Sequence, residues 1–359
     1  MYNETLVRHS LTELSRQVYA YPNRKTGWNF EKFVNSPDIR YFSYGRHAIH
    51  AAIETAGIGM GDKVLLPSFI CRELLSSINV TGATPIYYNV DESLQLSLPQ
   101  ESLPHAHAIL AVNFFGFPQD IAPFRAFCDR TGAILIEDNA HGFLSRDEHG
   151  IILGTRGDFG IFSLRKTLPI PNGAALLINT KGRKWTLPPQ LEPSKKPVSN
   201  SFKIKRNIGR LVPIIGVLLP ILLTTFGRKL RKFRTGHEIA PSPPDAEMIL
   251  PGSPPPCAKL KNLLNTVDVD WETDRRRNLY IAINDLIRNS GGKPVFENLP
   301  KNTVPYGFPF RAEGEALKTI RRHLLKLGLE CHPWPDLPDE IAPNAPKHYK
   351  SVWMVGFLW

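Results

Sequence analysis

The sequence predicts an α/β fold: a mostly parallel central sheet between helices, followed by a small C-terminal α+β domain. In the first half of the chain, short apolar runs alternate with stretches of helical periodicity. That alternation is typical of parallel strands joined by crossover helices. A proline-rich segment follows, and after it the order helix, strand, helix, strand indicates a second, smaller unit. A length of 359 residues allows two or three domains.

The elements of the first half follow in regular order. Residues 1–35 are mixed and polar, and we expect a lead-in segment with one short helix there. Alanines and isoleucines at helical spacing predict a helix over 47–55, and the same criterion predicts helices over 72–80 and 121–131. Apolar runs bounded by turn signals predict strands at 63–66, 85–90, 108–113, 133–136, 160–162 and 174–179. The glycines of 57–61 follow a helix and precede a strand, which is the reverse of a dinucleotide-binding loop, so they predict a helix end and a turn.

The second half begins with a segment of unusual charge. Between Ser194 and Arg234 there are eleven Lys and Arg and no Asp or Glu, and outside this segment basic and acidic residues number 33 each. The net charge of +11 therefore belongs to one insert, which argues against a nucleic-acid-binding surface. Its apolar run, 211–226, holds two prolines and is shorter than the roughly 20 residues of a spanning helix. Two interpretations stay open: shallow contact with an anionic membrane face, or a helical hairpin packed on the body or on a second subunit.

The remaining elements complete the predicted domain plan. Prolines predict a linker over 239–256. Helices are predicted over 268–289 and 314–327, a strand over 304–310, and a strand or loop over 329–334. The predicted division is a large domain, an insert with its linker, and a small C-terminal domain, at 1–194, 195–256 and 257–359. The chain stops inside an apolar run, so a truncated C-terminus is one expectation.

Cysteine usage and the N-terminus suggest a compartment. The four cysteines are scattered without a Cys-x-x-Cys pair, so we expect neither a metal site nor a disulfide framework. Free thiols suit a reducing cytosol. The first thirty residues hold no apolar core with a cleavage site, so no signal peptide is predicted. We therefore expect a cytoplasmic protein, with membrane association through the insert left open.

Polar residues follow two neighbouring predicted strands. Asp138 and His141 follow the run at 133–136, and Ser163 and Lys166 follow the next run. Because buried parallel strands open onto a site at their carboxyl ends, these side chains are expected to meet at one sheet edge. A carboxylate and a lysine in that position suit pyridoxal phosphate, which needs an amine for its aldehyde and an acid partner for its ring nitrogen.

These stretches resemble the DegT/DnrJ/EryC1/StrS family of pyridoxal-phosphate-dependent aminotransferases. The resemblance covers 41–179 well and 268–334 loosely. The motifs that carry it are Gly45-Arg46, Pro67-Ser-Phe-Ile-Cys71, Phe115-Gly116, Glu137-Asp138-Asn-Ala-His141, Phe162-Ser163 and Lys166. It implies an aspartate-aminotransferase-like (type I) fold and a homodimer. It also implies transfer of an amino group from an amino acid such as glutamate to a nucleotide-linked keto sugar, in polysaccharide or cell-surface sugar biosynthesis.

The resemblance also implies roles for individual residues. Lys166 would bond to the cofactor aldehyde and move a proton, with its pKa lowered by burial and by the neighbouring Arg165. Asp138 would pair with the pyridine nitrogen, and His141 would lie near the ring hydroxyl.

The cofactor phosphate is assigned to Ser163 and the Gly45-Arg46 turn, although Gly45 could equally mark a plain helix start. Cys71 stands where many members have an aromatic residue that stacks on the cofactor ring. The family segment by which a partner subunit reaches the phosphate is not visible, and 254–258 stands near its place.

Two alternatives remain beside the aminotransferase. One is other pyridoxal-phosphate chemistry on the same fold, such as removal of a sugar hydroxyl, although relatives of that kind use His in place of the lysine. The other is a non-catalytic protein of this fold, docked on a membrane or a protein complex through the insert.

Overall fold

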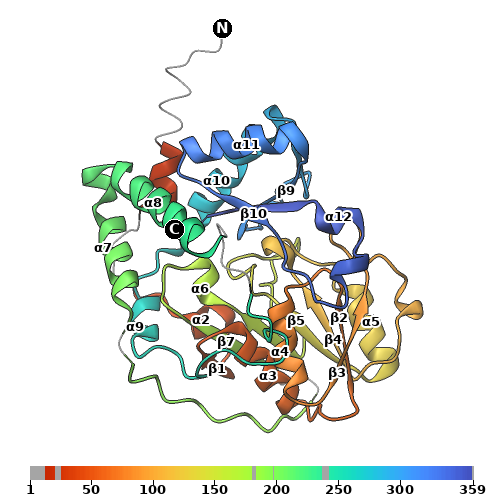
Figure 1. Cartoon of the computed structure of the whole chain (residues 1–359). Coiled ribbons are helices and arrows are strands. Elements are labelled where there is room, and N and C mark those ends of the chain that lie inside the picture. Colours follow the sequence, from red (N-terminus) through yellow and green to blue (C-terminus); the bar gives the residue numbers. More distant parts are fainter. Residues whose placement is uncertain (1–12, 21–25, 180–182, 197, 237–241, 358–359) are drawn as a thin grey trace.

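The computed structural model describes residues 13–20, 26–179, 183–196, 198–236 and 242–357 (Figure 1). Its larger sheet has seven strands in the order β1-β7-β6-β5-β4-β2-β3. They are β1 (Ile39–Phe42), β2 (Lys63–Pro67), β3 (Thr84–Tyr88), β4 (Ala108–Val112), β5 (Ile134–Asp138), β6 (Phe159–Phe162) and β7 (Ala174–Ile178). The five strands from β2 to β6 are parallel, whereas β7 and β1 form an antiparallel edge.

Helices enclose this sheet, as the alternating pattern predicted. Every residue of β4, β5, β6 and β7 is buried, which is expected for strands covered on both faces. The helices of this part are α2 (Phe30–Val34), α3 (Gly45–Thr55), α4 (Ser76–Asn79), α5 (Ala122–Thr131) and α6 (Leu164–Thr167). The helix predicted over 72–80 is a 3₁₀ turn, η1 (Arg72–Leu75), that continues into α4.

The C-terminal part is the predicted α+β unit, and two of its four strands were not predicted. Its antiparallel sheet has the order β10-β11-β9-β8. The strands are β8 (Lys293–Pro294), β9 (Gly307–Arg311), β10 (Cys331–Pro333) and β11 (Val352–Gly356), and the helices are α9 (Leu260–Leu264), α10 (Val269–Asn289), α11 (Gly314–Lys326) and α12 (Lys347–Lys350). The unpredicted strand β11 is central: it pairs with both β10 and β9.

Residues 13–20 lie against the C-terminal part. The Ser15 hydroxyl donates to the Leu327 carbonyl at 3.0 Å, and the Tyr19 hydroxyl donates to the Gly328 carbonyl at 2.5 Å. The predicted domain division, which groups this segment with the larger sheet, stays a prediction.

The predicted linker is hydrogen-bonded along the larger domain. The Ser43 N–H donates to the Pro254 carbonyl at 2.8 Å, and the Ser43 hydroxyl donates to the Ser253 carbonyl at 2.6 Å. His47 Nε2 lies 2.8 Å from the Pro251 carbonyl oxygen. The proline-rich segment is thus held beside the start of α3.

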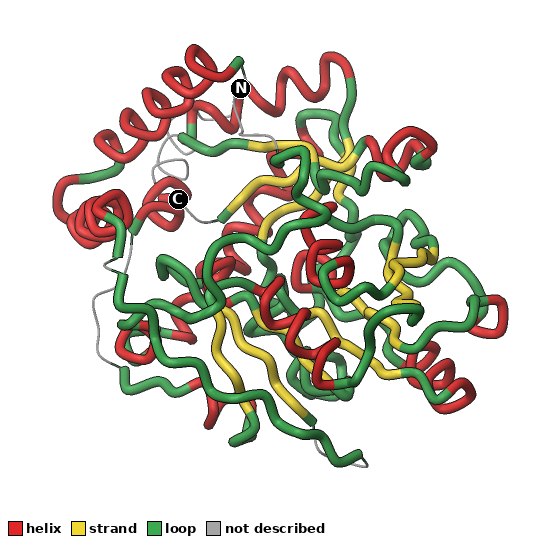
Figure 2. Tube along the Cα trace, turned by 60° about the horizontal axis from the view of Figure 1, so that its bottom comes forward, coloured by secondary structure: helices red, strands yellow, loops and turns green. Residues whose placement is uncertain are grey.

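The insert forms two helices, α7 (Asn200–Ile215) and α8 (Leu218–Thr235), at the periphery of the molecule (Figures 1 and 2). Gly216, with φ of 77°, separates them. Pro213 lies in the last turn of α7, and Pro220 lies in the first turn of α8, where a missing N–H costs little. No helix in the described part of the chain combines the length and apolar character needed to cross a bilayer.

Candidate functional site

The register of β5 and β6 brings their carboxyl ends together. Asp138 is the last residue of β5 and pairs with Ile161 on parallel β6. Ser163 follows β6 directly, and the single turn of α6 then presents Lys166. Pro169 and Pro171 follow shortly after this helix and prevent its extension. The amine and the carboxylate therefore reach the same sheet edge.

These groups surround one cleft, which holds about 690 Å³ of space including its open mouth. All seven residues expected at the site from the sequence line it: Gly45, Arg46, Cys71, Asp138, His141, Ser163 and Lys166. Three further lining residues, Tyr44, Arg165 and Trp334, were not assigned to the site from the sequence. Trp334 comes from the C-terminal part, so no local pattern near the strand ends could have indicated it.

The Lys166 amine faces the cleft and contacts an imidazole. Its Nζ lies 3.1 Å from His141 Nε2. Burial lowers the pKa of Lys166 below that of an ordinary lysine, the charge of Asp138 opposes this shift, and the charge of Arg165 adds to it. A lysine of lowered pKa is a better nucleophile and base at neutral pH.

Hydrogen bonds assign the proton on His141. The Phe115 N–H donates to Nδ1 at 3.3 Å, so Nδ1 is unprotonated and Nε2 carries the ring proton. Nε2–H can donate to the Lys166 amine only if that amine has a free lone pair. Burial, with the nearby Lys166 charge, holds the pKa of His141 well below its ordinary value. The geometry therefore fits a neutral imidazole beside a neutral amine.

Phe115 is held in an unusual conformation that orients this imidazole. It is a non-glycine residue with φ of 54°. Its N–H donates a hydrogen bond to His141 Nδ1, and its carbonyl accepts a 2.8 Å hydrogen bond from the Tyr306 N–H. The Tyr306 ring stacks on the His141 ring, with centroids 4.3 Å apart and planes 7° apart. Backbone strain at such a position is typical of functional sites.

Asp138 is the buried acid of the cleft. Burial raises the pKa of Asp138, and the Lys166 charge and the Ala140 N–H, which donates to Asp138 Oδ1 at 3.0 Å, act in the opposite direction. A cationic partner in the cleft would therefore favour its ionised form.

The other end of the cleft is suited to an anion. Helix α3 begins at Gly45, which lines the cleft, so the N-terminus of this helix lies here. A Cβ on Gly45 would lie 3.8 Å from the Ser163 Cβ, which places these two residues side by side. The Arg165 guanidinium lies over the Tyr44 ring at 5.0 Å, and its buried Nε has no hydrogen-bond partner among the described residues. Arg46 forms a 3.3 Å ion pair with Glu73.

Cys71 lines the cleft as predicted, and burial raises the pKa of its thiol. The aromatic surface nearby belongs to Trp334, whose ring centroid is 5.3 Å from that of His141.

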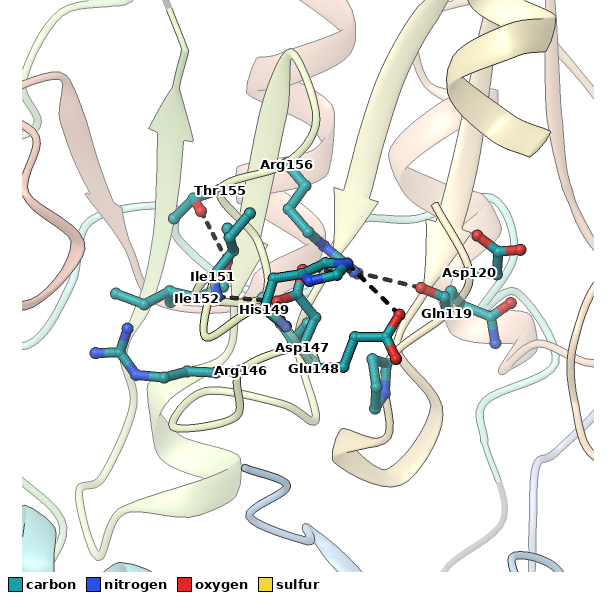
Figure 3. Close-up of polar contacts among 12 residues, drawn as sticks. Gln119, Asp120, Arg146, Asp147, Glu148, His149, Ile151, Ile152, Thr155 and Arg156 are labelled. Atoms are coloured by element: carbon teal, nitrogen blue, oxygen red, sulfur yellow. Dashed lines mark hydrogen bonds and ion pairs between the residues drawn. The ribbon is translucent and has the colours of Figure 1, made fainter. Parts of the chain in front are cut away.

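Glu137, although adjacent to Asp138, serves a structural ion pair. Neighbouring residues of a strand point to opposite faces of the sheet. Glu137 is fully buried and accepts hydrogen bonds from the Arg156 backbone N–H, Nε and Nη2 at 2.7 to 2.9 Å. Arg156 also donates to the Gln119 carbonyl, as Figure 3 shows. This pair fixes the loop after β5 from beneath the site.

Comparison with known proteins supports the resemblance seen in the sequence. Residues 27–181 match the DegT/DnrJ/EryC1/StrS aminotransferase family. A GDP-perosamine synthase of Vibrio cholerae is 31% identical over 157 residues, which are 42% of this chain and 42% of that enzyme. The chain thus matches less than half the length of this curated relative.

Solved structures show the fold over nearly the whole chain. Helicobacter pylori PseC, an aminotransferase involved in the biosynthesis of pseudoaminic acid, superposes with a TM-score of 0.61 at 11% identity, covering 97% of this chain and 90% of PseC. A Streptococcus pneumoniae protein described as a sugar aminotransferase, in its PLP form, gives 0.57 at 13% identity, covering 100% and 92%. The predicted type I aminotransferase fold is confirmed.

Proposed function

We propose that the chain is a pyridoxal-phosphate-dependent aminotransferase of the DegT/DnrJ/EryC1/StrS family, whose model residues 27–181 match. One observation carries the proposal: a half-buried amine, that of Lys166, and a buried carboxylate, that of Asp138, line one cleft at the ends of neighbouring strands.

The residues present fit the cofactor. The unpartnered Nε of Arg165, together with the Gly45 and Ser163 corner, suits a phosphate group. Asp138 would hold the ring nitrogen, and Lys166 would hold the aldehyde carbon. When bound, pyridoxal phosphate supplies an aldehyde that condenses with amines and a ring that accepts electrons from the adjacent carbon.

Three side chains of the cleft would then have separate roles in the reaction. Lys166 Nζ, with its lowered pKa, acts first as a nucleophile and then as the base that takes and returns a proton at the substrate carbon. His141 keeps this amine oriented through Nε2 and is itself held by Phe115 and Tyr306. The Asp138 carboxylate would hold the pyridine nitrogen of the bound cofactor and would keep it protonated, because a negative charge stabilises the protonated form.

The substrates that we propose are an amino acid donor such as glutamate and a nucleotide-linked keto sugar as acceptor. Two similar proteins support this class: a GDP-perosamine synthase and an aminotransferase involved in the biosynthesis of pseudoaminic acid. The pathway would be the synthesis of a polysaccharide or a cell-surface sugar.

We further propose a homodimer in a reducing compartment such as the cytoplasm. The family resemblance motivates the dimer, and light scattering of the purified chain tests it. The compartment is suggested by the cysteines, all four of which are free thiols in the structure.

An absorbance spectrum tests the function. With pyridoxal phosphate, the purified protein is expected to show a visible band from the lysine-bound cofactor, and glutamate should shift that band. Lys166→Ala should abolish both signals because, among the described residues, Lys166 is the one lysine that lines the cleft. The matched control is Lys293→Ala, an exposed lysine outside the cleft, which should behave as wild type. A band that survives Lys166→Ala unchanged would rule out the assignment.

A further inference from the structure

The helices α7 and α8, which we call the basic hairpin (residues 200–235), expose an unusual amount of apolar surface. Ten of the eighteen large apolar side chains that are exposed in the described part of the chain belong to it. They are Ile204, Leu211, Ile214, Ile215, Leu218, Leu219, Leu222, Leu223, Phe226 and Phe233. Scattered exposed apolar residues need no explanation, but a concentration of this kind marks an interaction surface.

On α8 these side chains form one stripe. Leu218, Leu222, Phe226 and Phe233 follow one another at steps of four, four and seven residues, the spacing of a single helical face. Leu218 is 74% exposed and Phe233 is 88% exposed. On α7, Ile204, Leu211 and Ile215 follow the same rule.

The opposite face of α8 is already occupied. Ile221 packs closely on Gly328: a Cβ on Gly328 would lie 2.6 Å from the Cγ1 of Ile221. Arg228 forms a 3.2 Å ion pair with Glu330. On α7, Arg206 Nη2 donates to the Thr266 hydroxyl at 3.3 Å. The body therefore fixes the hairpin from one side and leaves the apolar stripe facing outward.

The stripe is bordered by positive charge alone. All eleven charged residues between Ser194 and Arg234 are Lys or Arg, and exposed members such as Lys203, Lys229 and Arg234 flank the apolar run. An apolar stripe with a basic border and no acidic residue is the pattern of helices that lie in the interface of a charged bilayer.

We propose that the basic hairpin binds the surface of a membrane containing anionic lipids, with the stripe buried at the headgroup boundary. A second copy of the chain is a poorer occupant, because a two-fold contact between identical hairpins would place cations against cations. A nucleic acid would match the charge but leave the leucines in water. An anionic bilayer satisfies both features at once.

Vesicle flotation of the full chain tests this proposal, with lipid binding as the readout independent of catalysis. We expect binding to phosphatidylcholine vesicles that contain phosphatidylserine, much weaker binding without it, and release at high salt. The variant Leu218→Ser/Leu222→Ser/Phe226→Ser should bind at least about ten-fold more weakly, because the stripe loses its apolar area. Its control, Met60→Ser/Ile281→Ser, removes exposed apolar side chains elsewhere and should bind as wild type.

Charge is tested separately. Lys203→Gln/Lys229→Gln/Arg234→Gln should weaken binding to the anionic vesicles by at least about ten-fold, since each basic residue near such a surface strengthens binding roughly five-fold. The control Lys63→Gln/Lys293→Gln/Lys301→Gln removes three exposed lysines outside the hairpin and should have little effect. Absence of binding by the wild type at low salt would overturn the proposal. So would a stripe variant that binds normally, or one that only dissociates an oligomer, which would assign the stripe to a second copy.

Discussion

At the scale of single residues, the site depends on two bases that both stay neutral. Lys166 and His141 are 3.1 Å apart, and each would repel a proton on the other. Burial lowers the pKa of both. The Phe115 N–H decides which ring nitrogen carries the proton, so the lone pair of the lysine is directed at a donor. A neutral Lys166 amine needs no preceding deprotonation, and its lone pair has only to leave the imidazole before it attacks.

This arrangement predicts a dependence of stability on pH. The unfolded chain gains a proton on His141 as pH falls through 6.5, whereas the folded chain does not until its lowered pKa is reached. In that window the unfolded state binds more protons, so the free energy of unfolding should fall by up to about 1.4 kcal/mol per pH unit from this group. His141→Gln has no imidazole at this position, so its free energy of unfolding should fall less on acidification. Urea unfolding at a series of pH values measures the difference between the two proteins.

The buried His47 and the half-buried His332 also have pKa values lowered by desolvation. Both are present in the two proteins and cancel from that difference. Parallel losses of stability in wild type and His141→Gln would show that His141 does not stay neutral.

At the scale of elements, the turn after β4 packs against the segment that carries His141. Gly116 has φ of 91°, and a Cβ there would lie 2.7 Å from the Val304 carbonyl and 3.1 Å from the His141 carbonyl. Both obstacles are backbone atoms, which cannot rotate away. The turn therefore packs between the segment that carries His141 and the strand region of the C-terminal part.

Gly116→Ala is expected to destabilise the protein by about 2 to 4 kcal/mol, because backbone strain and a steric clash add. The matched control is Gly150→Ala, which has a similar φ of 81° but open space around the new Cβ, and should cost only about 1 kcal/mol. Urea unfolding compares the two variants. Equal losses of unfolding free energy in the two variants would mean that the turn relaxes around the new Cβ, and that the close contacts of Gly116 do not contribute to stability.

Much of this element-level structure could be predicted from the sequence, and the reasons are physical. The strands of the larger sheet are buried on both faces, so they stand out as apolar runs, and the polar residues that end β5 and β6 indicate the site. Trp334, which lines the cleft, and Tyr306, which stacks on His141, could not be found in this way, because tertiary packing brings them there from the C-terminal part. Strand β11 was not predicted for a related reason: it is buried because it pairs with β9 and β10. The proline composition of the linker gave no sign of its hydrogen bonds to Ser43.

At the scale of the whole molecule, one buried arginine joins the C-terminal part to the site. Arg276 on α10 donates to the Thr167 carbonyl at 2.7 Å, next to Lys166, and to the Tyr306 carbonyl at 2.8 Å. Its Nε donates to Glu272 at 2.6 Å, and its side chain is fully buried. A residue of the small domain thus holds both the lysine turn and the tyrosine that stacks on His141.

Arg276→Met keeps much of the side-chain volume but removes these hydrogen bonds and leaves Glu272 paired with Arg275 alone. Breaking a buried ion pair in this way is expected to cost about 3 to 5 kcal/mol of folding free energy. It should also weaken cofactor binding at least about ten-fold, because the Lys166 turn and Tyr306 lose their common support.

The next residue of the same helix provides the control: Arg277 also donates to two carbonyls, those of Pro300 and Thr303, but does not reach the lysine turn. Arg277→Met should therefore lower stability without changing cofactor affinity, and titration of the visible absorbance with pyridoxal phosphate separates the two variants. If cofactor affinity is unchanged in Arg276→Met, or falls equally in both, then Arg276 only joins the domains and does not position the site.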